Sequence, residues 1–144
     1  MKERKKSWDE KCHIVRNSFL RIKKERHHVF ARNFYNNLFF LNPDIKDYFK
    51  EVDMDHQSRA LIDGLRFLTE YSVKDNANAH TQIARLSEVH SHKGLDVHPK
   101  LYYYWIEALI MTMKKEDPDW YDDMEYYWRE VIFVPISFFI SRFF

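Results

Sequence analysis

The 144-residue sequence contains only two glycines, four prolines and one cysteine. Antiparallel β-proteins need many tight turns, which glycine, proline and asparagine usually supply, so this scarcity favours helices over strands. The single cysteine, Cys12, excludes an internal disulfide and is typical of proteins in a reducing compartment. We therefore expect an all-α protein of the cytoplasm.

Net charge is almost absent as well, because 23 basic residues stand against 22 acidic ones and the formal net charge is +1. This balance gives no electrostatic footprint for nucleic acid or for an anionic membrane surface. The longest apolar run, residues 131–140, is shorter than the ~20 residues that span a bilayer. The basic residues 1–6 are followed by no apolar segment, so we expect no secretory signal. Neither nucleic acid nor a membrane is an expected partner.

Aromatic residues, by contrast, make up 17% of the sequence, so the core or a pocket must hold large rings. Apolar residues recur at helical spacing nearly throughout the chain. Prolines divide this pattern: Pro43 should start a short helical segment over 43–49, and Pro118 separates the last two helices. Gly94 is expected to close the helix before it in the left-handed conformation. We expect one domain over residues 1–144, with six to seven helices of unequal length, which is unlike a four-helix bundle.

Three passages of the sequence carry a family pattern. They are Phe34-Tyr35-Asn-Asn-Leu38-Phe39 with Asn42-Pro43 and Phe49; Gln57-Ser58-Arg59-Ala60-Leu61; and Leu86-Ser-Glu-Val-His90-Ser-His-Lys-Gly94, followed by Pro99 and Tyr102. In this order and spacing they resemble the globin family, namely flavohaemoglobin globin domains, single-domain bacterial globins and globin-coupled sensors. The resemblance implies the globin fold around a pocket for haem b, held non-covalently because the sequence has no CxxCH motif.

The resemblance makes His90 the axial ligand of the haem iron, since neutral imidazole is the usual donor in globins. Leu86 precedes it by one helical turn and should face the porphyrin. His92 is the alternative ligand: it fits the family spacing to Tyr102 better, but it places Glu88 instead of Leu86 against the apolar ring. Tyr102 is expected to support the proximal side.

The same resemblance places Tyr35 and Gln57 on the opposite, distal side. There the Tyr35 phenol would donate a hydrogen bond to a dioxygen ligand, and the Gln57 amide would donate to the ligand or to Tyr35. A shift by one residue would replace Gln57 with His56, but it would spoil the leucine stripe that begins at Leu61. Phe49 and Leu61 are expected to be apolar walls that exclude water.

The implied function is a haem globin that reversibly binds dioxygen, nitric oxide or carbon monoxide, for sensing, storage or nitric oxide detoxification. Nitric oxide dioxygenation needs electrons, and because the chain has no room for a flavin or nicotinamide domain, a reductase would be a separate partner. Residues 141–144 offer no carboxylate to a proximal hydrogen-bonded set, which argues against peroxidase-like chemistry. The ring-rich C-terminal helix is a candidate homodimer interface. The alternative function is a haem-less globin-fold interaction or signalling module.

Overall fold

The computed structural model describes residues 5–91, 93–94 and 97–143. Within these ranges the chain forms six α-helices and two 3-10 helices and no strand, which confirms the all-α prediction. The elements are α1 (Trp8–Leu20), η1 (Lys24–Arg26), α2 (His27–Leu41), η2 (Pro43–Phe49), α3 (Met54–Glu70), α4 (Ala77–His90), α5 (Leu101–Glu116) and α6 (Met124–Phe143). None of the helices in the described ranges is long and apolar enough to cross a membrane.

Short polar side chains set where the elements of the candidate site begin. Asn42 precedes η2 and accepts a hydrogen bond from the Asp44 amide at 3.1 Å, and Pro43 then opens the helix as the sequence predicts. Asp53 caps α3 by accepting from the Asp55 amide at 3.0 Å. Asn76 caps α4 by accepting from the Ala79 amide at 3.0 Å. These caps fix the start of both helices that are expected to flank the haem.

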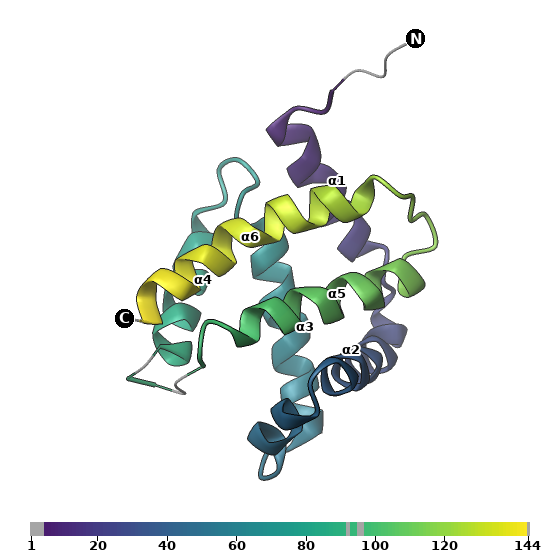
Figure 1. Cartoon of the computed structure of the whole chain (residues 1–144). Helices are drawn as coiled ribbons and strands as arrows, with labels where there is room; N and C mark the ends of the chain where they lie inside the picture. Colours follow the sequence, from purple (N-terminus) through teal and green to yellow (C-terminus); the bar gives the residue numbers. More distant parts are fainter. Residues whose placement is uncertain (1–4, 92, 95–96, 144) are drawn as a thin grey trace.

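The helices pack against one another around one apolar core. In Figure 1, α5 and α6 lie side by side and run across α3, while α4 lies near the end of α6. The α2 helix packs on α5, and α1 packs on α6 and α3. Large side chains that are fully buried come from all six α-helices, so the whole bundle shares one core: Val15, Phe30, Leu65, Ile83, Leu109 and Trp128.

A buried carboxylate ties α1 to the connection between α5 and α6. The side chain of Asp117 is fully buried and accepts hydrogen bonds from Ser18 Oγ at 2.6 Å and from Arg21 Nε and Nη2, both at 2.7 Å. Ser18 Oγ in turn accepts from the indole Nε1 of Trp128 at 3.1 Å. Burial raises the pKa of the Asp117 carboxyl, but the bonds from Arg21 and Ser18 outweigh burial and hold that pKa below its ordinary value.

The prediction for Gly94 is wrong in its detail, because this residue has no positive φ. Glycine is needed there for a different reason. The chain turns back so closely on the last turn of α4 that a Cβ at position 94 would overlap the Val89 carbonyl oxygen. The glycine therefore permits a close backbone approach next to His90.

Candidate functional site

Tyr35 and Gln57 meet between α2 and α3, as the family pattern predicts for the distal pair. The Gln57 amide Nε2 donates a hydrogen bond to Tyr35 Oη at 2.9 Å. Tyr35 lies at the middle of α2 and is only 4% exposed, whereas Gln57 lies in the first turn of α3 and is half-buried. Two side chains that are 22 residues apart in sequence therefore form one polar group inside an apolar contact between helices.

Aromatic rings surround this polar pair. The Phe49 ring lies 5.4 Å from the Tyr35 ring between centroids, and the Phe39 ring lies 6.0 Å from Tyr35 and 5.6 Å from Phe49. Phe34 contacts Tyr35 edge-on at 5.1 Å. Such rings exclude water from the phenol, and a polar contact in dry surroundings is stronger than the same contact in water.

The environment keeps Tyr35 a neutral phenol that has a proton to donate. Burial raises the pKa of Tyr35 to about 12, although the Gln57 hydrogen bond acts in the opposite direction. Because Gln57 donates to the phenol oxygen, the Tyr35 hydroxyl proton is not used in that bond. No other hydrogen-bond partner of Tyr35 Oη occurs in the part of the chain that the structure describes. The hydroxyl can therefore donate to a ligand placed beside it.

Leu61 is buried and His56 is exposed, as expected if Gln57, and not His56, is the α3 residue that faces the site. Leu61 lies one turn after Gln57 on α3 and is 6% exposed, in the core cluster. His56 is exposed, and its backbone amide donates to the Asp53 cap. The geometry thus pairs Gln57, and not His56, with Tyr35.

His90 is the last residue of α4 and has a defined tautomer. Its Nδ1 lies 2.8 Å from the carbonyl oxygen of Leu86, and since a carbonyl can only accept, Nδ1 carries the proton. In the neutral imidazole, Nε2 is then the nitrogen that carries the lone pair. Nε2 has no hydrogen-bond partner within the described residues. This arrangement is typical of a metal-binding histidine that is oriented through its second nitrogen.

The His90 ring packs against a phenylalanine of α6. The rings of His90 and Phe139 are stacked, with centroids 5.5 Å apart and planes at 20°. Tyr102, at the start of α5, meets the same Phe139 ring edge-on at 6.0 Å and is 6% exposed. Burial raises the pKa of Tyr102 to about 12, so its phenol is neutral too. Tyr102 thus supports the ring that supports His90, and the rival ligand His92 lies outside the described residues.

The chemistry of these residues fits a haem. One imidazole nitrogen of His90 has no partner among the described residues, and the predicted wall residues Leu86, Leu61 and Phe49 are apolar and belong to the core or pack against it, as a porphyrin requires. On α3, a Cβ added at Gly64 would meet no atom of the described residues within 4 Å. The described part of the chain therefore leaves open space beside Gly64.

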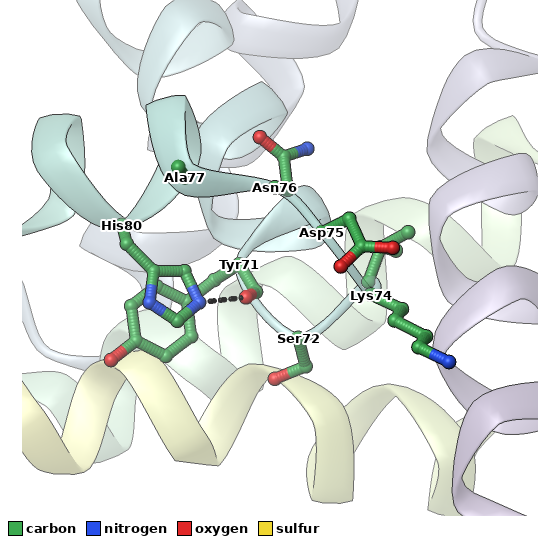
Figure 2. Close-up of a pocket in the computed structure, with 8 residues that line it drawn as sticks. Tyr71, Ser72, Lys74, Asp75, Asn76, Ala77 and His80 are labelled. Carbon is green, nitrogen blue, oxygen red and sulfur yellow. Dashed lines mark hydrogen bonds between the residues drawn. The ribbon is translucent and has the colours of Figure 1, made fainter.

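The structure also contains a hollow of about 420 Å³ that lies away from these residues. Figure 2 shows it at the connection between α3 and α4, where the loop residues Ser72, Lys74 and Asp75 surround it. On one side the His80 ring stacks on Tyr71 at 4.2 Å, and His80 Nε2 lies 2.7 Å from the Tyr71 carbonyl oxygen. None of the site residues predicted from the sequence lines this hollow.

Two residues of the site, Phe39 and Phe139, are not predicted as site residues from the sequence. Phe39 could be placed near Tyr35 from its spacing of four on one helix, because such residues share a face. Phe139 belongs to the apolar stripe of α6 and reads as plain core, since its contact with His90 depends on how α4 crosses α6.

Comparison with known proteins agrees with this geometry. A protein-family model described as Globin matches residues 32–136, a range that includes Tyr35, Gln57 and His90. Among solved structures, the chain is similar to a protein from Pseudomonas aeruginosa PAO1 that is described as structurally highly homologous to a human haemoglobin. The two chains are 26% identical and superpose with a TM-score of 0.76, over 92% of this chain and 98% of the other. No curated protein sequence matches this chain. The family match covers most of the chain, and the fold is that of a bacterial globin-like protein, so this chain belongs to the globin family.

Proposed function

We propose that this globin binds one haem b non-covalently through His90 and reversibly binds a diatomic gas, namely dioxygen, nitric oxide or carbon monoxide, as a single domain. The observation that carries the proposal is the His90 geometry. Nδ1 donates to the Leu86 carbonyl, and Nε2, which carries the lone pair in the neutral imidazole, has no partner in the described chain.

On the proximal side, the chain holds the imidazole in one orientation. The bond to the Leu86 carbonyl fixes the tautomer, and the Phe139 ring restricts rotation of the His90 ring by stacking on it. The His90 ring is thus contacted by a hydrocarbon ring and a backbone carbonyl. No carboxylate forms an ion pair with His90 among the described residues. A neutral environment of this kind keeps the ligand a plain imidazole, which supports gas binding over peroxidase-like chemistry.

On the distal side, the chain supplies a preorganised hydrogen-bond donor. A haem at this place would supply an iron atom to which a diatomic gas can bind. Gln57 occupies a lone pair of Tyr35 Oη and so leaves the hydroxyl proton for the ligand. Phe49 and Phe39 exclude water from the phenol, and a charge-assisted bond is stronger without competing water.

A strong distal donor slows the loss of dioxygen more than that of carbon monoxide, because bound dioxygen has the larger negative charge. Slow release favours sensing, storage or nitric oxide dioxygenation over oxygen delivery. For dioxygenation we propose that a separate reductase supplies the electrons. The test is oxygen-dependent consumption of nitric oxide with and without an added reductase, which should be fast and sustained only with the reductase.

The proposal is tested by the visible absorption spectrum of the purified protein after addition of haemin and reduction. We expect a sharp Soret band with one equivalent of haem and a shift of that band with carbon monoxide. His90→Ala should lose the band, whereas His92→Ala, the rival, and His80→Ala, a matched control near the other end of α4, should keep it. If the wild type takes up no haem, the proposal fails, and the chain is then a globin-fold interaction module. A band lost in His92→Ala and kept in His90→Ala would move the ligand to His92.

We also propose that two copies associate through the outer face of α6 and that the protein works in the cytoplasm. Exposed apolar side chains on that face support the dimer: Tyr126 is 64% and Phe133 is 55% exposed. Sedimentation velocity should give a dimer mass that falls to the monomer in Phe133→Lys. A monomer mass at all concentrations would contradict the dimer.

The proposed location in the cytoplasm is supported by the single, buried Cys12, because a chain with one cysteine is typical of a reducing compartment.

A further inference from the structure

The α3 helix contains a glycine, Gly64, that neither the backbone nor the packing of the chain requires. The chain has only two glycines, and the other one, Gly94, is needed for a close backbone approach. Gly64 lies in the middle of the 17-residue helix α3, where glycine stabilises a helix less than alanine does. A position that weakens the helix needs a compensating reason.

The structure excludes the usual reasons for a glycine at position 64. Its φ is not in the left-handed region, so an L-residue could adopt the same backbone. A Cβ added there would meet no atom of the described residues within 4 Å, so none of their side chains or backbone occupies the space. Gly64 itself is half-buried. The space beside it is thus left open by the described chain and is available to a group that is not part of the chain.

The position of Gly64 on α3 indicates what that partner is. At about 100° per residue, Gly64 lies within about 60° of Gln57, Leu61 and Leu68 around the helix axis. Leu61 and Leu68 are buried, and Gln57 contacts Tyr35. Ala60, about 40° away on the other side, is exposed. The open space next to Gly64 thus lies at the edge of the α3 face that carries Gln57 and the apolar wall of the site.

We propose that Gly64 is a positioning residue that admits the edge of the haem macrocycle against the backbone of α3. This inference rests on the proposed haem binding and adds a steric role for one residue. A flat ring can approach a helix at van der Waals distance only where no Cβ projects from it. The size of the side chain at position 64 therefore controls how closely α3 and the ring pack, and so how long the haem stays bound.

The inference predicts that substitutions at position 64 act oppositely on the haem-free and haem-loaded protein. In the haem-free chain, Gly64→Ala replaces a poor helix former in open space, so its Tm should rise by about 2–5 °C. Gly64→Leu also enters open space, so the haem-free Tm should be no lower than that of the wild type. In the haem-loaded protein the leucine competes with the ring, and the rate of haem loss should rise about 10-fold or more, with alanine in between.

The experiment measures the Tm of the haem-free chain by circular dichroism and the rate of haem transfer to an excess of a haem-scavenging apoprotein. Asp63→Ala and Asp63→Leu are matched controls, because Asp63 is exposed, neighbours Gly64 and lies off this face. Neither control should change the rate of haem loss more than about two-fold.

Three results would overturn the inference. The first is haem loss from Gly64→Leu at the wild-type rate, which would leave the proposed function intact. The second is a lower haem-free Tm for Gly64→Ala and Gly64→Leu, because it would mean that the space beside Gly64 is filled by the chain. The third is the absence of haem uptake by the wild type, which would remove the proposed function together with this inference.

Discussion

Replacing Tyr35 with phenylalanine isolates one atom of the proposed site. The ring contacts with Phe34, Phe39 and Phe49 remain, because phenylalanine has the same ring, and only the hydroxyl is lost. A hydrogen bond to a partly charged ligand contributes about 1.5–3 kcal/mol. Since each 1.4 kcal/mol is a factor of ten, dioxygen should dissociate roughly 10- to 100-fold faster from Tyr35→Phe. Carbon monoxide, which carries less charge, should change only a few-fold.

Gln57→Leu tests the other half of the distal pair. It removes the amide that orients Tyr35 at 2.9 Å but keeps the phenol itself. The increase in dioxygen dissociation should therefore be smaller than in Tyr35→Phe, and the double variant should not exceed Tyr35→Phe by the full product of the single effects.

Stopped-flow displacement of dioxygen by carbon monoxide measures these rates on the reduced, haem-loaded protein. Tyr127→Phe is the matched control, because it removes a hydroxyl from a half-buried tyrosine of α6 outside the site. A dissociation rate within about two-fold of wild type in Tyr35→Phe would mean that the phenol does not reach the ligand.

Two further predictions concern stability. Asp117→Asn removes the charge that Arg21 and Ser18 pair with and should lower the free energy of unfolding by about 2–3 kcal/mol in urea. Because the folded pKa of Asp117 lies below its ordinary value of 3.8, this stability is present above about pH 4 and is lost as the pH falls further, and the variant should show a flatter acid limb. In alkali the free energy of unfolding should change with pH in the opposite direction. Burial raises the pKa of Tyr35 and Tyr102 from 10.0 to about 12, so the free energy of unfolding should be highest below pH 10 and fall towards pH 12. Tyr35→Phe should reduce that fall by about 2–3 kcal/mol, and an equal fall in both proteins would contradict the buried phenol.

The sequence predicts the helices well, because their signals are local. Helical spacing of leucines marks α3, and the segment that Pro43 opens is the 3-10 helix η2. The distal pair could also be placed, since Tyr35 and Gln57 each belong to a short family pattern and the structure brings them to 2.9 Å. The roles of these residues towards haem stay predictions.

Contacts between distant segments could not be predicted in the same way. Asp117 reads in the sequence as part of a helix break, yet its partners Ser18 and Arg21 lie almost 100 residues away. The stack of Phe139 on His90 also depends on the crossing of two helices and leaves no periodic trace. Gly94 shows a third limit: a glycine after a helix usually indicates a left-handed residue, but here it serves a close backbone approach.

Chemical rescue with imidazole tests directly whether His90 holds the haem iron. His90→Gly removes the imidazole side chain, so the haem-loaded variant should have a weak, displaced Soret band that free imidazole restores. The wild-type Soret band should need no added imidazole. The analogous variant His80→Gly, at the other end of α4, should bind haem without added imidazole. A wild-type spectrum in His90→Gly with no imidazole added would mean that His90 does not hold the iron.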